Sequence, residues 1–337
     1  MTEVLADDYD LVVFDLDGVV YLIDRPIPGA AEAVERLRAG GTAVAYATNN
    51  ASRRAGDVAA LLTGMGVPAE PAEVLTSAGA AAALLAEKLP AGAPVLVVGA
   101  DALRAEVHDA GLRPVEAYED QPAAVVQGYG PDVGWRVLAE AALSVRDGAM
   151  WVATNTDRTL PSPRGPLPGN GSLVAVLRTA LDREPDLIVG KPEPTLFTTA
   201  ASLSGARRAL VVGDRLDTDI QGAVGAGMDS LLVLTGVSGP AELLAAPPER
   251  RPTYLAADLA GLFRPAEEIR VPAAGDETGG WRIGREGEQV TLHGSGDPVD
   301  ALRLVCGVTW GGVPVGEIKA GSEPARELLA GWTTAAA

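Results

Sequence analysis

The alternation of two kinds of segment constrains the fold of this chain more than any other feature of its sequence. Short apolar runs bounded by Gly, Pro or Asn alternate with Ala- and Leu-rich segments of amphipathic, helical pattern. This alternation is typical of βαβ units, whose strands form mainly parallel sheets. We expect strands at 11–14, 43–47, 95–98, 124–127, 150–153, 187–189, 209–212 and 230–234. We expect helices at 30–39, 55–65, 77–88, 102–110, 135–145, 171–181, 194–203 and 218–226.

Composition excludes several classes of protein. The 337 residues, 47% of them hydrophobic, allow two domains and a small third with buried cores. The net charge of −18 argues against a diffuse footprint on nucleic acid or an anionic membrane. Apolar runs are too short for a bilayer, and the N-terminus carries charges where a signal peptide needs an apolar core, so we expect a cytoplasmic protein. The single Cys306 excludes an internal disulfide, and His108 and His293, the two histidines, lie far from the motifs below.

An acidic motif ends the first predicted strand. Asp15, Leu16, Asp17 and Gly18 follow the apolar run 11–14. Because side chains alternate along a strand, the two carboxylates can face one centre, at the strand end where open α/β sheets bind ligands. Neighbouring carboxylates repel unless a cation lies between them, and oxygen ligands of this kind suit Mg²⁺. The alternative is an acidic turn, since Asp and Gly are common turn residues.

Two further strand ends carry groups suited to an anion. Thr48, Asn49 and Asn50 follow the strand 43–47 and offer a hydroxyl, two amides and backbone N–H groups at the start of a helix. Their alternative role is helix capping. Lys191 follows the strand 187–189, where it could neutralise phosphate oxygens; an ordinary surface lysine is the alternative.

The strand end after 209–212 is acidic again. Asp214 would complete a hard-oxygen Mg²⁺ site with Asp15 and Asp17. Asp219 would hold a metal-bound water or a neighbouring backbone group. An acidic capping sequence explains any one of these strand ends, but not all four together.

In this order, the four motifs resemble those of the haloacid dehalogenase (HAD) superfamily: an Asp-x-Asp pair, a Thr or Ser, a Lys and a terminal acidic motif. Thr48 follows Asp15 by 33 positions, whereas Lys191 follows Thr48 by 143, which leaves room for an inserted cap domain in the second interval. This arrangement resembles subfamily IIA, the NagD-like phosphatases with a C2a cap. The resemblance implies an α/β fold with a Rossmann-like core on a parallel sheet and an inserted α/β cap.

The resemblance also implies a division into domains. We predict a discontinuous HAD core at 1–77 and 187–264, a C2a cap at 78–186, a Pro- and Gly-rich linker at 265–280 and a small C-terminal α+β module at 281–337. In the module we expect a hairpin over 281–292, a helix capped by Asp297 and a last helix over 323–332. A tail after such a core resembles actinobacterial glycerol 3-phosphate phosphatases whose C-terminal segment is similar to part of an N-acetyltransferase fold.

A HAD phosphatase of this kind would depend on Mg²⁺. The resemblance implies that Asp15 is the nucleophile and forms an aspartyl-phosphate. Asp17 would protonate the leaving alkoxide and then activate the hydrolytic water. Asp15, Asp17 through its backbone carbonyl, and Asp214 would hold the metal, with Asp219 in support.

The remaining candidate residues would bind the substrate. Thr48, Asn49 and Lys191 would hold the phosphoryl oxygens, with Asn50 in support. The cap would select the alcohol, and its candidate side chains are Asn155, Asp157 and Arg158.

We therefore expect a small phosphomonoester as the partner of this chain, glycerol 3-phosphate first. The alternatives are 2-phosphoglycolate and pyridoxal phosphate, although Arg158, Thr159 and Leu160 stand where some pyridoxal-phosphate phosphatases have an aromatic residue and a histidine. An alternative from a different functional class is a non-catalytic regulatory binding protein. The presence of all four motifs disfavours this alternative. We expect no nucleic acid or membrane partner, and related caps often provide homodimer contacts.

Overall fold

The computed structural model describes residues 3–23 and 25–334. The chain divides into two compact units, which we call the first unit (Met1–Val44 and Ser204–Ala337) and the second unit (Ala45–Leu203). Strand β4 (Ala43–Thr48) contains the boundary between them. The finer division into core, cap, linker and module stays a prediction. Among the described residues, no helix combines the length and the apolar character that crossing a membrane requires.

A parallel sheet forms the centre of the first unit. Its strands follow the order β15 (Tyr254–Ala256), β14 (Asp229–Val233), β13 (Ala209–Gly213) and β1 (Leu11–Phe14), with Leu11 opposite Ala209. Nearly every residue of these strands is buried, as expected for a parallel sheet covered on both faces. The other elements of this part are β2 (Tyr21–Leu22), β3 (Arg25–Pro26), α1 (Ala30–Ala39), α8 (Gln221–Gly225), α9 (Pro240–Leu244) and α10 (Ala266–Ile269).

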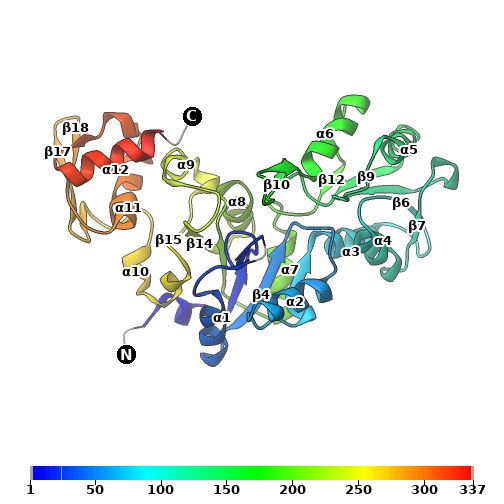
Figure 1. Ribbon diagram of the computed structural model, residues 1–337, viewed down its shortest axis with the longest axis horizontal. Helices are drawn as coiled ribbons and strands as arrows, with labels where there is room; N and C mark the ends of the chain where they lie inside the picture. The colour runs from blue at the N-terminus through cyan, green and yellow to red at the C-terminus, as the bar shows by residue number, and fades with distance from the viewer. Residues whose placement is uncertain (1–2, 24, 335–337) are drawn as a thin grey trace. The chain divides into compact units, whose positions relative to one another are not determined.

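The C-terminal residues form a small sheet with two helices. The sheet order is β16 (Glu277–Thr278), β17 (Trp281–Glu286), β18 (Gln289–Gly294) and β19 (Lys319–Ala320). The predicted hairpin is confirmed as β17 and β18, and Figure 1 shows helices α11 (Pro298–Thr309) and α12 (Glu323–Thr334) beside them. Asp297 caps α11 as predicted, because its carboxylate accepts the Val299 N–H at 2.9 Å.

This C-terminal part shares a core with the parallel sheet of the first unit. Side chains of α9 and β15 join those of α11, β17 and β18 in one buried apolar cluster. The Trp310 indole N–H donates to the Leu243 carbonyl at 3.1 Å. The segment 265–280 also pairs with the sheet, since the Val271 N–H donates to the Thr253 carbonyl at 2.9 Å. Such backbone pairing needs no apolar period, so the sequence carried no sign of it.

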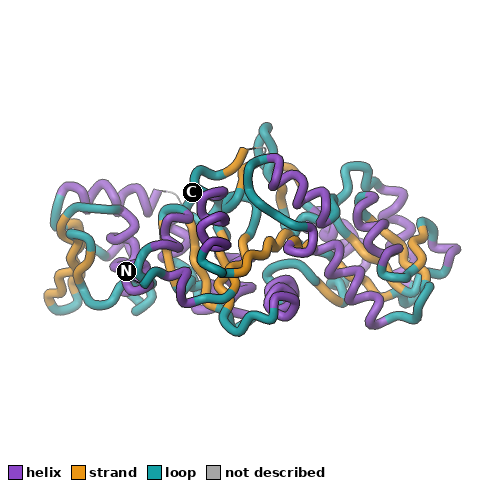
Figure 2. Tube along the Cα trace, turned by 90° about the horizontal axis from the view of Figure 1, so that it is seen from below, coloured by secondary structure: helices purple, strands orange, loops and turns teal. Residues whose placement is uncertain are grey.

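The second unit contains a parallel sheet between two layers of helices. The sheet order is β12 (Leu187–Ile188), β9 (Met150–Ala153), β8 (Ala124–Gln127), β6 (Pro94–Val98) and β7 (Arg113–Val115). Alternate residues of β6 face opposite sides: Val95 and Val97 pack with α3 (Ser77–Lys88) and α4 (Asp101–Asp109). Leu96 and Val98 pack with α5 (Trp135–Arg146) and α6 (Asn170–Leu181). Figures 1 and 2 show these strands with helices on both sides, so the expected α/β architecture is confirmed.

The remaining elements of the second unit lie outside this five-stranded sheet. Strand β4 pairs in parallel with β5 (Val74–Thr76). The other elements are α2 (Ala55–Gly64), β10 (Thr159–Leu160), β11 (Leu167–Pro168) and α7 (Thr195–Ser204).

The predicted helices and strands agree with the structure within a few residues, with one change of type. The expected helix at 218–226 is a π-helical segment, Leu216–Ile220, followed by the short helix α8. The sequence analysis missed the three-residue strands β5, β7 and β15. Strands this short are defined by their pairing partners and show no apolar period of their own.

Candidate active site

Asp15 lies where β1 ends, in a tight loop. Its N–H donates to the Val212 carbonyl at 2.8 Å, which fixes it beside the end of β13. The chain then turns at Gly18, whose φ of 87° belongs to the left-handed region that glycine adopts readily. A Cβ at Gly18 would also lie 2.6 Å from the Asp214 Oδ2 atom, so the loop approaches that carboxylate more closely than a side chain would permit.

Asp214 follows β13 and is held by the loop that follows β14. Its Oδ2 accepts the Val237 N–H at 2.7 Å, and its carbonyl accepts the Ser238 N–H at 2.9 Å. The same loop reaches the motif after β1, because the Thr235 hydroxyl donates to the Gly18 carbonyl at 2.6 Å. Sequence analysis did not single out this loop, which carries no charged side chain between Leu234 and Gly239.

Asp219 lies in the π-helical segment next to these two residues. Its Oδ2 accepts the Arg215 N–H at 3.1 Å. A Cβ at Gly213 would lie 2.2 Å from the Asp219 Cβ, so glycine at the end of β13 lets the two segments meet. Asp217, by contrast, turns to the Arg215 guanidinium, with oxygen to nitrogen distances of 3.0 and 2.9 Å.

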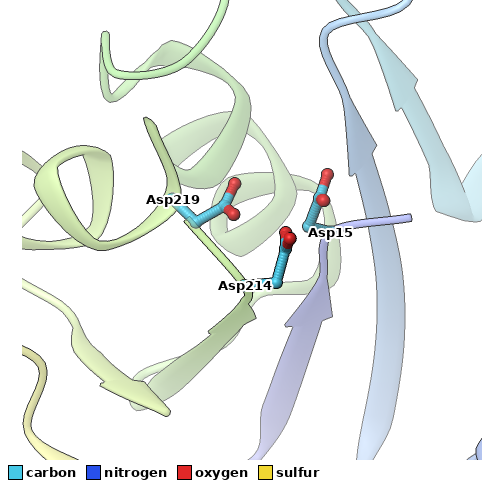
Figure 3. A group of neighbouring side chains, drawn as sticks. All are labelled: Asp15, Asp214 and Asp219. Atoms are coloured by element: carbon cyan, nitrogen blue, oxygen red, sulfur yellow. The ribbon is translucent and has the colours of Figure 1, made fainter. Parts of the chain in front are cut away.

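The structure thus brings three buried carboxylates together in the first unit. One oxygen from each of Asp15, Asp214 and Asp219 lies within 4.8 Å of the others. Figure 3 shows the three side chains turned toward a shared space. Three buried anions this close repel strongly, and a hard divalent cation with oxygen ligands relieves that repulsion. The donor set therefore fits Mg²⁺. The half-buried Asp17 side chain is outside this group, and its predicted contribution through the backbone carbonyl stays a prediction.

In the second unit, Thr48 and Asn50 shape the loop after β4. The Thr48 hydroxyl accepts the Asn50 N–H at 3.1 Å, and the Asn50 Oδ1 accepts the Ser52 N–H at 2.8 Å. These contacts form local turns. They do not cap α2, which begins at Ala55 after an N-cap at Arg54.

Lys191 is buried, with 3% of its surface exposed, and its backbone is bound by Asn49. The Lys191 N–H donates to the Asn49 Oδ1 at 2.8 Å, and the Asn49 Nδ2 donates to the Lys191 carbonyl at 3.0 Å. A Cβ at Gly190 would lie 2.5 Å from both the Asn49 Oδ1 and the Thr154 carbonyl. Glycine before the lysine is therefore what allows Asn49 to reach it.

Two predicted cap residues lie against Asn49. The Asn155 Nδ2 donates to the Asn49 carbonyl at 2.6 Å, and the Asn49 Nδ2 lies 3.0 and 3.1 Å from the two Asp157 oxygens. Arg158 takes part through its carbonyl, which accepts from the Gly169 N–H and the Ser172 hydroxyl. The second unit therefore gathers Asn49, Asn155, Asp157 and Lys191 into one polar network.

Two members of this network are not among the predicted site residues. The Ser77 hydroxyl donates to the Asn49 carbonyl at 2.6 Å. The buried Asn170 donates through its Nδ2 to the Asn155 carbonyl at 2.7 Å and to the Gln127 carbonyl at 3.2 Å. Asn170 stands between two glycines, and this pattern of a polar side chain where backbones approach closely was a usable signal.

Comparison with known families agrees with this arrangement. The haloacid dehalogenase-like hydrolase family matches residues 12–113, and a HAD-hydrolase-like family matches residues 188–262. Residues 278–333 match a GCN5-related N-acetyltransferase like domain.

Individual relatives cover two thirds of this chain or more. The D-glycerol 3-phosphate phosphatase of Mycobacterium tuberculosis is 44% identical over 98% of this chain and 95% of its own length. An acid sugar phosphatase of Staphylococcus aureus is 38% identical over 68% of this chain and 88% of its own length.

Solved structures give the same result. The glycerol phosphate phosphatase of M. tuberculosis in complex with magnesium superposes with a TM-score of 0.90 at 46% identity, covering 99% of both chains. A 4-nitrophenylphosphatase from Thermotoga maritima gives a TM-score of 0.71 at 32% identity, covering 77% of this chain and 98% of its own. The chain therefore belongs to the haloacid dehalogenase-like hydrolases.

Proposed function

We propose that this protein is a Mg²⁺-dependent phosphatase that hydrolyses a small phosphomonoester, with glycerol 3-phosphate as its substrate. The observation that carries the proposal is the buried group of Asp15, Asp214 and Asp219, which offers one carboxylate nucleophile and the oxygen donors for a divalent cation. The relative that is 44% identical over 98% of this chain bears the name of a D-glycerol 3-phosphate phosphatase, which supports the substrate.

Asp15 and Asp17 divide the chemistry between them. A carboxylate oxygen of Asp15 attacks phosphorus, an O–P bond forms and the bond from phosphorus to the alcohol oxygen breaks. Asp17 gives its proton to the departing alkoxide, which would otherwise be a strongly basic leaving group. Asp17 then takes a proton from the water that attacks the aspartyl-phosphate, and this step releases phosphate and restores the Asp15 carboxylate.

The metal site follows from the donors present. Asp15, Asp214 and the backbone carbonyl of Asp17 would hold Mg²⁺, and Asp219 would support the site from the neighbouring segment. When bound, Mg²⁺ supplies charge neutralisation between the Asp15 carboxylate and the anionic phosphoryl group. The 234–239 loop keeps Asp214 in place through the Val237 N–H.

The second unit supplies the groups that bind the phosphoryl oxygens. Lys191 contributes positive charge and Thr48 a hydroxyl, which stabilise charge as it moves onto the oxygens in the transition state. Asn49 contributes its backbone N–H, and Asn50 orders the loop. Asn155 and Asp157, held against Asn49, place the cap segment that selects the alcohol.

We also propose that the enzyme acts in the cytoplasm as a homodimer formed through the cap. The single Cys306 is fully buried and can form no internal disulfide, which is compatible with a reducing compartment. In the predicted cap, Trp135 and Leu143 on α5 and Val176 on α6 are 80%, 45% and 49% exposed. These three side chains are the candidate contacts of the dimer that we propose.

The decisive experiment is a screen of phosphorylated metabolites with Mg²⁺. We expect the highest kcat/KM for glycerol 3-phosphate, and equal turnover of many unrelated esters would contradict that assignment. Asp15→Asn should abolish phosphate release while the melting temperature stays near that of the wild type. Asp132→Asn, on an exposed loop, is the matched control. Normal turnover by Asp15→Asn would contradict the mechanism.

A further inference from the structure

Asn49 contacts both backbone groups of Lys191 with one side chain. Its Oδ1 accepts the Lys191 N–H at 2.8 Å and its Nδ2 donates to the Lys191 carbonyl at 3.0 Å. Asn49 is itself 9% exposed, so water competes little for these bonds. Two hydrogen bonds from one planar amide fix the position of the Lys191 backbone and limit its rotation. The Asn49 Nδ2 carries two protons. One is donated to the Lys191 carbonyl and the other to a second partner, so neither is available for a phosphoryl oxygen.

That second partner is Asp157. The Asn49 Nδ2 lies 3.1 and 3.0 Å from the two Asp157 carboxylate oxygens. An amide turned by 180° would point its oxygen at this carboxylate and would place like groups opposite each other at Lys191. Hydrogen bonds to a charged acceptor are about twice as strong as neutral ones, so Asp157 fixes the orientation in which Asn49 can bind Lys191.

The backbone of Asn49 is fastened from two further directions. Its carbonyl accepts the Ser77 hydroxyl and the Asn155 Nδ2, each at 2.6 Å. Asn155 also accepts the Asp157 N–H through its Oδ1 at 3.2 Å. The side-chain amide and the carbonyl of Asn49 are therefore both bonded within the second unit, and a shift of the Asp157 segment would reach Lys191 through this amide.

We propose that Asn49 is a positioning residue that holds Lys191 in its working place, and that Asp157 acts on Lys191 through the orientation of the Asn49 amide. The effect on turnover rests on the function proposed above, whereas the effect on Lys191 itself does not. A displacement of about 1 Å in a group that meets the transition state can cost about 100-fold in rate. Asn49→Ala should therefore lower kcat/KM by about 100-fold.

A double-mutant cycle separates positioning from direct contact with substrate. If Asn49 acts through Lys191, Asn49→Ala should lower kcat/KM by less than about 3-fold once Lys191→Met has removed the ammonium group, because effects of residues that act as a unit are not additive. A full, additive loss in the Lys191→Met background would show that the Asn49 side chain binds the substrate independently, and would overturn the proposal.

A second measurement reports on Lys191 without turnover. The chain has three lysines, Lys88, Lys191 and Lys319, of which only Lys191 is buried. In protein labelled with ¹³C-lysine, the Lys191 Cε resonance should shift in Asn49→Ala, while the resonances of Lys88 and Lys319 stay in place as internal controls. Ser144→Ala removes a buried hydroxyl of the same unit that donates to the Glu140 carbonyl, outside this network, and we expect it to leave the Lys191 resonance in place.

Each outcome of these measurements either supports or overturns the proposal. An unmoved Lys191 resonance in folded Asn49→Ala overturns the proposal even if activity falls. If Asn49→Ala does not fold, Asp157→Asn takes its place, since it keeps the shape of the side chain and removes its charge. A shift of the Lys191 resonance in Asp157→Asn supports the role of Asp157, and an unchanged resonance overturns it. If the wild type hydrolyses no phosphomonoester, the proposed function fails, yet the resonance still decides the positioning of Lys191.

Discussion

Replacing Gly236 by alanine should damage the metal site by a purely steric route. The added Cβ would lie 1.9 Å from the Asp214 Oδ2 and 2.4 Å from its carboxyl carbon. Ordinary van der Waals contact begins at 3.4 Å, so the oxygen or the loop must move by about 1.5 Å. Gly236 does not have a positive φ, so its backbone conformation is open to alanine. The cost of the substitution therefore comes from the clash with Asp214.

The expected loss of Mg²⁺ affinity follows from how little the distances between a metal and its ligands can vary. Ligand distances in metal sites are held within about 0.2 Å, several times less than the displacement forced on Asp214. Mutation of a group that only orients a metal ligand lowers metal affinity about 10- to 100-fold. A mutation that moves the ligand itself should therefore lower the affinity by about 100-fold or more. We expect Gly236→Ala to raise the Mg²⁺ concentration for half-maximal activity by about 100-fold, equivalent to about 2.8 kcal/mol.

The matched control is Gly239→Ala in the same loop. A Cβ there would meet nothing within 4 Å. Gly239 is the N-cap of α9, so alanine should cost at most about 1 kcal/mol of stability and leave Mg²⁺ binding unchanged. The assay is Mg²⁺ titration by calorimetry and by phosphate release, with thermal unfolding of both variants. A Mg²⁺ dependence of Gly236→Ala within about 2-fold of the wild type would refute the assignment of Asp214 as a metal ligand.

Two further predictions concern stability and assembly. The Asp10 carboxylate accepts the Arg207 and Arg208 backbone N–H groups at 3.0 and 2.9 Å, and these bonds lower its pKa. The stabilisation of the folded state by these bonds is fully present above the usual pKa of about 3.9 and is lost as the pH falls through the lowered pKa. Urea unfolding should therefore show that Asp10→Asn is less stable than the wild type at pH 7 and equally stable in strong acid. For assembly, light scattering should show a dimer that Trp135→Ser weakens. Leu203→Ser, which changes an apolar residue of similar exposure outside the predicted cap, should leave the dimer intact. A monomeric wild type would contradict the proposed dimer.

Local sequence was sufficient for most of the secondary structure and for the family. Apolar runs such as 11–14 and 209–212 form β1 and β13 because strands buried on both faces need apolar side chains at nearly every position. Amphipathic spacing predicts the ends of the longer helices to within a few residues. Asp15, Thr48, Lys191 and Asp214 could be chosen from the sequence because each follows an apolar strand directly, and the carboxyl ends of parallel strands are where such sheets bind ligands.

Contacts between distant segments had no such local sign. Asp219 was predicted as a supporting residue of the metal site, but its close approach to Asp15 and Asp214 depends on a π-helical segment and on the glycine at 213. The hydroxyl of Thr235 reaches Gly18 across 217 positions. Likewise, the segment 265–280 is held by backbone pairing with Thr253 and by the Arg270 guanidinium, which donates to the Tyr254 hydroxyl at 3.0 Å, and neither partner can be read from the segment itself.

The sequence by itself therefore determined which chemical groups this protein carries, in what order, and on which strand ends. Only the tertiary structure decided what each group touches: that Asn49 binds the backbone of Lys191, that Asp157 orients Asn49, and that the C-terminal part shares its core with α9 and β15. The physical reason is that composition and period set the burial and the direction of a segment, whereas hydrogen-bond partners are set by three-dimensional proximity, which is decided when all segments pack together.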